Sequence, residues 1–334
     1  MDILLALFLV IVFLVVLNQS SHLTITNAIK VSDITGLSKT TVGFLLLAFS
    51  TSLPELSVAF IASLGGDAAI SAGTVIGSNI VNVCLIIGLG AILVALKRPS
   101  TQSLVSPFAK GELGSLYSGL FVASIIPLFL VYLVGANWLV GLLLILVFVF
   151  YSFQLVKITV PQEEMPRVSD TVRRRLRLYV ALTFLGAIGV IASAHFIVES
   201  AVSIAAFMGV PKTLIGATVI AFGTSLPEFS LDIRAFLRGE SGLAFGDVVG
   251  SCFINMTLIL GIGLLLPALL GQPLTMNMLV FLDIVVFSLI ANLLLWYFLS
   301  MERLGWREGA ILLFIYLLFL ATSLGAIQLR FQPT

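Results

Sequence analysis

Runs of 18 or more apolar residues recur along almost the whole of this 334-residue chain. Runs of that length are typical of α-helices that cross a lipid bilayer, because a helix needs about 20 apolar residues to span the hydrocarbon layer. Charged residues make up 10% of the sequence, whereas a soluble domain usually carries about 25%. The alternating segments of about ten residues that mark a membrane β-barrel do not occur. The sequence therefore predicts an all-α integral membrane protein.

Ten apolar segments are predicted to span the membrane, and the polar segment 161–177 divides them into two sets of five. We expect one five-helix half over 1–160, a linker over 161–177 and a second five-helix half over 178–334. The first segment lacks the basic start of a secretory signal, so we expect it to remain as a span. The predicted spans are 3–30, 38–65, 69–96, 113–133, 136–157, 177–207, 211–236, 242–270, 276–300 and 306–327.

The basic residues predict how the chain lies in the membrane, because Lys and Arg are concentrated in cytoplasmic loops. If the N-terminus is outside, 15 of the 17 Lys and Arg residues fall inside, and only Lys212 and Arg330 fall outside. We therefore expect a multi-pass protein of the cell membrane with both termini outside and the 161–177 loop in the cytoplasm. Since five is odd, the two halves then have opposite orientations. The net charge of +1 carries no information about nucleic acid, and no nucleic-acid partner is expected.

Two nearly identical nonapeptides, FSTSLPELS at 49–57 and FGTSLPEFS at 222–230, lie 173 residues apart. At that offset 13 of 28 residues are identical between 36–63 and 209–236, and 9 of 18 between 73–90 and 246–263. Shared apolar composition does not produce matched Gly, Pro, Glu, Ser and Asn. The halves are thus predicted to be inverted-topology repeats, which are typical of secondary transporters with a substrate site at the midplane between the repeats.

Each nonapeptide places a helix breaker beside a carboxylate. Pro54 and Pro227 lack an N–H group and clash with the preceding turn, so each helix is expected to break or kink there. Backbone carbonyls released by the break are acceptable inside a membrane only where they face a polar cavity or an ion. Glu55 and Glu228 follow directly, and a carboxylate at mid-membrane depth is a candidate functional group. Both motifs therefore point to a buried polar site.

Further oxygen atoms surround each glutamate. Hydroxyl side chains accompany both motifs, and the next segment of each half carries polar residues four apart, on one helical face. They are Thr51, Ser52, Thr224 and Ser225 in the motifs, then Thr74, Ser78 and Asn82 in the first half and Asp247, Ser251 and Asn255 in the second. Oxygen ligands of this kind suit a hard cation such as Ca²⁺ or Na⁺. Two carboxylates balance one Ca²⁺, two protons or, in part, Na⁺.

The paired motifs STSLPELS…GSNIVN, within 43–90, and GTSLPEFS…GSCFIN, within 216–263, resemble the two repeats of the Ca²⁺:cation antiporter superfamily, in its prokaryotic sodium/calcium exchanger branch. The resemblance covers both halves in order. It implies a ten-span inverted-repeat fold that exchanges Ca²⁺ for Na⁺ by alternating access. It also implies that the long first and sixth spans move against the remaining bundle. Neither enzymatic activity nor a cofactor is expected, and one chain is expected to function alone.

The residues and the resemblance together give a set of candidate cation ligands. Two are the shared carboxylates, most of the others supply side-chain oxygens, and the two alanines enter through the resemblance as backbone-carbonyl ligands. The set is Glu55, Glu228, Thr51, Thr224, Ser78, Ser251, Ser52, Ser225, Asn82, Asn255, Ala48 and Ala221. Helix packing by the serines and interhelical hydrogen bonding by the asparagines remain alternative roles.

The sequence departs from the pattern of the superfamily at two positions. Ser50 replaces the usual Gly of the first motif, and Asn255 stands where potassium-dependent members are expected to carry Asp. The second difference argues against a potassium requirement and leaves two central carboxylates. Protons therefore remain an alternative to Na⁺ as the counter-ion. The Gly-Asn-Ala motif of the proton-coupled branch is absent, which favours Na⁺.

The sequence argues against two functions of other classes. A cation channel normally needs a symmetric ring from several subunits, whereas two repeats in one chain predict an enclosed site. An intramembrane enzyme finds no support, because the matched segments carry no histidine cluster or nucleophile–base pair. Cys84 and Cys252 are expected to be small buried hydrophobes without a disulfide.

Five other titratable residues are assigned mainly structural roles. Asp247 shares the face of the site and is predicted to be a vestibule or helix-start residue, with direct ion contact as the alternative. Asp232 is predicted to be a cytoplasmic-end charge beside an arginine. For Asp283, a hydrogen-bonded structural role is at least as well supported as a functional one. His22 and His195 coincide at the repeat offset and are expected to be polar residues of the moving helices, with proton sensing as the alternative.

Overall fold

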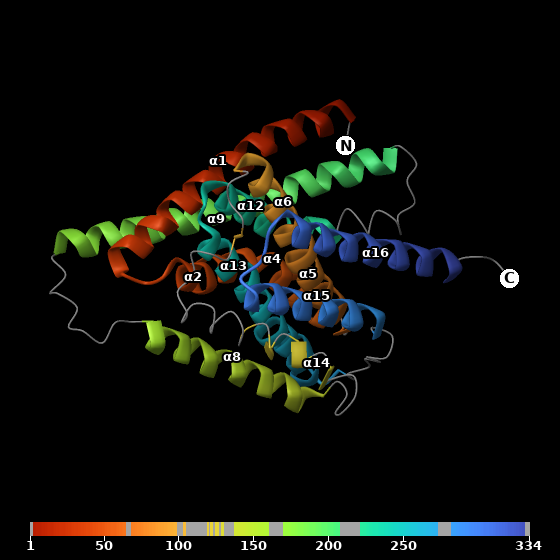
Figure 1. The fold of residues 1–334 in the computed structure, drawn as a ribbon. Helices are drawn as coiled ribbons and strands as arrows, with labels where there is room; N and C mark the ends of the chain where they lie inside the picture. The colour runs from red at the N-terminus through yellow and green to blue at the C-terminus, as the bar shows by residue number, and fades with distance from the viewer. Residues whose placement is uncertain are drawn as a thin grey trace.

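The computed structural model describes residues 3–64, 68–98, 103–104, 137–159, 170–207, 221–272 and 282–330, together with a few residues between 119 and 129. All of its regular elements are helical (Figure 1). In chain order they are α1 (Ile3–Thr35), α2 (Lys39–Val42), η1 (Gly43–Leu47), α3 (Ala48–Thr51), α4 (Leu53–Leu64), α5 (Ala68–Ile80), η2 (Val81–Ile87), α6 (Gly88–Lys97), α8 (Trp138–Thr159), α9 (Asp170–Phe207), α11 (Ala221–Thr224), α12 (Leu226–Arg238), α13 (Ser241–Ile254), η5 (Asn255–Ile259), α14 (Leu260–Leu269), α15 (Leu282–Ser300) and α16 (Trp306–Arg330).

Six helices of the described chain are long and apolar enough to cross a membrane. A seventh span arises if the bent pair Lys39–Thr51 and Leu53–Ile61, which meet at 40°, is taken as one crossing. The apolar helix Trp138–Phe153 is shorter. The prediction of an all-helical membrane protein is confirmed. The predicted span 113–133 falls largely outside the described residues, as do residues 211–220 of the seventh.

Helix α9 begins earlier than the sequence predicted. Its first residue is Asp170, so the second part of the predicted 161–177 linker is helical, and residues 161–169 lie outside the described chain. The 38-residue helix is longer than a bilayer requires. Its basic first turns, which include Arg174 and Arg175, therefore extend beyond the apolar stretch.

The sequence repeat is also a repeat of local structure. Adding 173 to the bounds of α3 gives those of α11, and adding it to the start of α4 gives the start of α12. In the same way α5, η2 and α6 correspond to α13, η5 and α14, with ends that agree within two residues where both are described. Even the wider π-helical turns η2 and η5 recur. Equivalent sequences thus form equivalent elements in both halves.

The repeated elements form the centre, and the longest helices lie outside it. Two-thirds of the most apolar window is buried in Ser71–Lys97 and in Ser241–Leu269, against 17% in α1. Helices α1 and α9 lie side by side along one flank, and α8 lies on the other (Figure 1). This arrangement places the two nonapeptides in the interior.

Glycines allow α1 and α9 to approach closely. A Cβ atom at Gly186 would lie 2.4 Å from Thr24 Oγ1, and one at Gly189 would lie 2.5 Å from Ser20 Oγ. Two turns farther on, the rings of Phe13 and Phe196 stack with their centroids 4.4 Å apart. Small residues at a helix crossing are the usual means of association in a membrane. The two long helices therefore form one tightly packed pair.

Candidate functional site

Both central helices are interrupted at the residue before Leu-Pro-Glu. Ser52 (φ −77°, ψ 4°) separates α3 from α4, and Ser225 (φ −91°, ψ 9°) separates α11 from α12. Pro54 and Pro227 then occupy the first turn of the new helix, where a missing N–H costs nothing. The predicted breaks are confirmed. Ser50, the departure from the usual Gly, stays helical and donates its hydroxyl to Leu46 O at 2.7 Å.

Glu55 and Glu228 each lie in the first turn of the helix after a break. A helix N-terminus stabilises a negative charge, because its backbone N–H groups are unpaired. Each residue is 1% exposed, and the two carboxylates are close enough to repel each other. The Oε2 atom of each has no hydrogen-bond partner among the described residues. Two mirrored acids thus meet in the interior, each with an oxygen free for a cation.

Hydroxyl groups from both halves surround the two glutamates. Ser78 Oγ donates to Glu55 Oε1 at 3.3 Å, and Ser225 Oγ donates to Ser78 Oγ at 3.3 Å. Thr224 also contacts Glu55 and Thr51 contacts Glu228, so each glutamate meets a threonine of the other half. Ser52 is buried, and its Oγ has no partner within the described chain. The structure therefore brings the motif hydroxyls together around the carboxylates.

Asp247 lies inside this cluster, so the prediction of a vestibule or helix-start residue is wrong. Thr51 Oγ1 donates to Asp247 Oδ1 at 3.2 Å, and Ser251 Oγ lies 3.5 Å from the same oxygen. The hydroxyls of Thr51 and Ser251 are 3.4 Å apart. Asp247 is completely buried, and its Oδ2 is unpartnered in the described part of the chain. A third carboxylate therefore borders the site.

The asparagines connect the two halves. Asn255 Nδ2 donates to Asn79 Oδ1 at 3.0 Å, and Asn79 Nδ2 donates to Cys252 O at 3.4 Å. The Oδ1 atoms of Asn82 and Asn255 have no partner in the part of the chain described. Asn255 thus combines an interhelical hydrogen bond with an oxygen left available. Asn79 was missed from the sequence because the residue at its repeat position is a cysteine, so the repeat comparison did not mark it.

Ala48 and Ala221 could contribute only backbone carbonyl oxygens, unlike the side-chain ligands. Ala48 O already accepts hydrogen bonds from Ser52 N at 3.1 Å and from Thr51 Oγ1 at 3.3 Å. The Ala48 carbonyl is therefore engaged within the chain in this conformation, and its role as a cation ligand stays a prediction. Ala221 is the first residue of α11.

Asp232 and Asp283 also lie elsewhere than expected. Asp232 is completely buried and forms no ion pair with Arg234 in the described residues, so the prediction of a cytoplasmic-end charge is wrong. Arg234 Nη2 instead donates to Asn18 Oδ1. Asp283 is exposed in the first turn of α15, which does not support a buried structural role.

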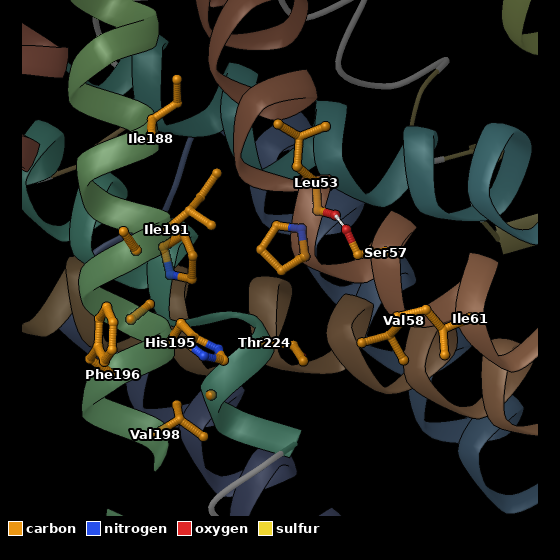
Figure 2. Close-up of a pocket in the computed structure, with 15 residues that line it drawn as sticks. Leu53, Ser57, Val58, Ile61, Ile188, Ile191, His195, Phe196, Val198 and Thr224 are labelled. Atoms are coloured by element: carbon orange, nitrogen blue, oxygen red, sulfur yellow. Dashed lines mark hydrogen bonds between the residues drawn. The ribbon is translucent and has the colours of Figure 1, made fainter. Parts of the chain in front are cut away.

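A cavity of about 780 Å³ reaches the site from the side of α9. Figure 2 shows Ile191 and His195 of α9 facing Leu53 and Ser57 of α4 across it, with Thr224 at its base. Its lining also includes Pro54 and Pro227. His195 is largely exposed, 3.9 Å from Glu199. The cavity thus joins the breaks of both motifs to the flank occupied by α1 and α9.

The oxygen atoms of the site define its chemistry. No group of three His, Cys, Asp or Glu side chains in the described ranges is placed to hold one metal ion. Ligation therefore needs hydroxyl, amide or carbonyl oxygens beside the carboxylates, and such all-oxygen sets suit hard cations. Broken helices with paired acids at their centre are the features of a membrane transporter for cations.

The chain belongs to the family described as sodium/calcium exchanger protein, whose sequence profile matches residues 5–157 and 178–325. The sodium/calcium exchanger MaX1 of Methanosarcina acetivorans is 31% identical over 92% of this chain and 95% of that protein. The inner membrane protein YrbG of Escherichia coli strain K12 is 30% identical over 70% of each chain. The resemblance to the Ca²⁺:cation antiporter superfamily is thereby confirmed, and with it a membrane cation antiporter.

A solved structure has the same fold. The sodium-calcium exchanger NCX_Mj, soaked with 10 mM Na⁺ and zero Ca²⁺, superposes with a TM-score of 0.82 at 26% identity. The match covers 96% of this chain and 99% of that one.

Proposed function

We propose that the protein exchanges Ca²⁺ for Na⁺ across the membrane by alternating access, and that Glu55 and Glu228 bind the cations directly. The observation that carries the proposal is the meeting of these two buried carboxylates, each with an unpartnered oxygen. The hydroxyls of Thr51, Ser78 and Thr224 contact them from both halves. The relatives named sodium/calcium exchangers support the choice of ions.

Charge explains why transport is coupled. Removing an ion from water costs several kcal/mol even after relaxation of the protein. An empty site would carry two buried carboxylates, so changing access without a cation is unfavourable. One Ca²⁺ neutralises both Glu55 and Glu228, and Na⁺ ions replace it on the return. Exchange rather than free flow follows, because the site changes its side of access only when a bound cation neutralises the two carboxylates.

Helices α1 and α9 are the elements proposed to switch access. They pack on each other along one flank, and α9 forms one wall of the cavity beside Pro54 and Pro227. Displacement of the pair along the broken helices would open or close this route while the remaining elements hold the ligands. The remaining ligand candidates, Ser52, Ser225, Ser251, Asn82, Asn255 and the carbonyls of Ala48 and Ala221, would complete the ion shells in the different states.

The proposed function also implies a membrane topology and a functional unit of one chain. We place the protein in the cell membrane with both termini outside and residues 161–177 on the cytoplasmic side, as the distribution of basic residues indicates. The halves are then inverted repeats of five helices, and one chain holds a complete site.

The decisive experiment is Na⁺-driven transport in proteoliposomes. Vesicles loaded with Na⁺ and diluted into Na⁺-free medium are expected to accumulate ⁴⁵Ca²⁺, and Glu55→Gln or Glu228→Gln is expected to abolish uptake. Glu199→Gln is the matched control, because the Glu199 side chain is exposed on α9. Normal uptake by both motif variants would refute the assignment.

A Ca²⁺/H⁺ antiporter is the second candidate, since two protons also neutralise two carboxylates. Sodium-free vesicles with an imposed pH gradient separate the two candidates. Uptake driven by the pH gradient alone would identify protons as the counter-ion. Unitary currents in a planar bilayer would instead identify a channel.

A further inference from the structure

A second acidic pair adjoins the proposed exchange site. Asp232 lies on α12, four residues after Glu228, and Asp247 lies on α13. Residues four apart share a helix face about one turn apart, so Asp232 is displaced from Glu228 toward the arginine end of α12. The carboxyl groups of Asp232 and Asp247 interact directly. Both residues are completely buried.

The pair offers three unused oxygen atoms. Neither Oδ1 nor Oδ2 of Asp232 has a hydrogen-bond partner among the residues described, and Oδ2 of Asp247 also has none. Asp247 Oδ1 is held by Thr51 Oγ1 at 3.2 Å, which fixes the direction of the free oxygen. A buried carboxylate without compensation costs several kcal/mol, so the pair needs a positive charge.

The described basic residues do not supply that charge. The ion pairs of the described chain are Lys39 with Glu240 and His195 with Glu199, and neither involves Asp232 or Asp247. Arg234, the nearest arginine in sequence, donates to Asn18. Arg238 donates to Thr26 Oγ1 at 2.9 Å. The described basic residues therefore leave the pair to be neutralised by a proton shared between the two carboxyl groups or by a bound cation.

The geometry points to a second cation position, held by Asp232 and Asp247, on the arginine side of the Glu55–Glu228 site. This inference rests on the proposed exchange of Ca²⁺. Asp232 lies about one helical turn from Glu228 on α12, so the two acidic pairs form adjoining positions. No group of three His, Cys, Asp or Glu side chains in the described residues is placed around one ion. Two carboxylates balance one divalent ion, so the second position takes Ca²⁺. The Thr51 hydroxyl contacts Glu228 and Asp247 and thereby links the two positions.

Such a position gives the exchanger a place where an ion waits next to the central site. An ion held between Asp232 and Asp247 advances by one helical turn to reach Glu228. Repulsion between neighbouring cations then favours release from the central site, as in other multi-ion pathways. The second position thus lowers the Ca²⁺ concentration needed to load the protein from that side.

Equilibrium binding of ⁴⁵Ca²⁺ to purified protein in Na⁺-free detergent solution tests the inference. Wild type is expected to bind two Ca²⁺ per chain, and Asp232→Asn is expected to bind one. In proteoliposomes, Asp232→Asn is expected to retain Na⁺-driven uptake, with a KM for Ca²⁺ about tenfold above that of wild type. Asp283→Asn, an exposed acid on α15, is the matched control and keeps two ions. The conservative Asp232→Glu is expected to retain the second ion, and it serves if the asparagine variant does not fold.

The outcomes separate this inference from the proposed function. One Ca²⁺ per wild-type chain, or two in folded Asp232→Asn, overturns the second position while exchange stands. Absence of both Ca²⁺ binding and Na⁺-driven uptake in wild type overturns exchange and the second position together. Two ions in wild type and one in Asp232→Asn support the inference.

Discussion

The hydroxyl of Thr51 donates to Asp247 Oδ1 at 3.2 Å, although the two residues are 196 positions apart. Thr51 ends α3 just before the break, and Asp247 lies in the middle of α13. The contact joins the broken helix of the first half to the ligand helix of the second. The same hydroxyl lies 3.3 Å from Ala48 O and 3.4 Å from Ser251 Oγ. Thr51 is therefore a junction within the site.

Replacing Thr51 by Val is expected to lower the apparent Ca²⁺ affinity in Na⁺-driven uptake by about tenfold. The variant keeps the shape but removes the hydroxyl, and leaving a buried acceptor unsatisfied costs about 1–3 kcal/mol. Thr51→Ser keeps the hydroxyl and is expected to stay within about twofold of wild type. Concentration-dependent ⁴⁵Ca²⁺ uptake measures both variants. Equal Ca²⁺ affinity of Thr51→Val and wild type would show that the Thr51 hydroxyl does not contribute to Ca²⁺ binding.

The sequence predicted those parts of the site that depend on local signals. Pro54 and Pro227 are such signals, because a residue without an N–H removes a hydrogen bond from a helix interior and so favours a break or kink there. Glu55 and Glu228 follow in the chain, and their position after the break was predictable for the same reason. Their meeting was inferred from the repeat, since equivalent motifs in two halves form equivalent elements.

The contacts of Asp232 and Asp247 could not be predicted in the same way. At the repeat offset they pair with Ala59 and Thr74, so the comparison of the halves did not mark Asp232 and marked Asp247 only as one of the polar residues on the ligand-bearing face. Arg234, two residues after Asp232, suggested a surface charge. Packing of α12 against α13 decides their environment instead. Such tertiary contacts between unrelated sequence positions leave no periodic or local pattern.

The glycines at the repeat positions 77 and 250 differ in their surroundings. A Cβ atom at Gly77 would meet no atom of the described residues within 4 Å. A Cβ atom at Gly250 would lie 2.7 Å from Ala48 Cβ and 3.0 Å from Phe44 Cα. Gly250 is therefore the position that lets α13 pack on η1 and α3.

Gly250→Ala is expected to destabilise the protein, whereas Gly77→Ala is not. Overpacking a close contact typically costs 1–3 kcal/mol, while alanine in an open helical position favours the helix by about 1 kcal/mol. Thermal unfolding of the purified variants, followed by fluorescence, measures the difference. Equal melting temperatures for Gly250→Ala and wild type would show that α3 and α13 separate easily.

Asn255→Asp is expected to destabilise the cation-free protein by about 1–3 kcal/mol, because the change removes the amide donor to Asn79 Oδ1 and places two acceptors together. Asn79→Asp makes the same change of charge, keeps an acceptor for Asn255 Nδ2 and loses only the longer hydrogen bond of 3.4 Å to Cys252 O, so a smaller loss is expected. Chemical or thermal unfolding without Na⁺ or Ca²⁺ compares the two. A larger loss for Asn79→Asp would contradict the donor role of Asn255.

Cross-linking distinguishes movement of α1 and α9 as a pair from movement of either helix alone. Ser20 Cβ lies 3.1 Å from a Cβ atom built on Gly189, so S20C/G189C is close to the spacing of about 3.5–4.5 Å that a disulfide needs. Ser21 Oγ contacts Ser230 Oγ, so S21C/S230C joins α1 to α12 of the central site. The native Cys84 and Cys252 are buried, which limits competing oxidation.

Oxidation of S20C/G189C is expected to preserve Na⁺-driven ⁴⁵Ca²⁺ uptake, because the disulfide lies within the moving pair. Oxidation of S21C/S230C is expected to block uptake, and reduction by dithiothreitol is expected to restore it, because that disulfide fixes the pair to the bundle. The reduced form of each variant is its own control for folding and ion binding. Full uptake by oxidised S21C/S230C would mean that access alternates without displacement of α1 from α12, and the switch would then have to lie in other helices.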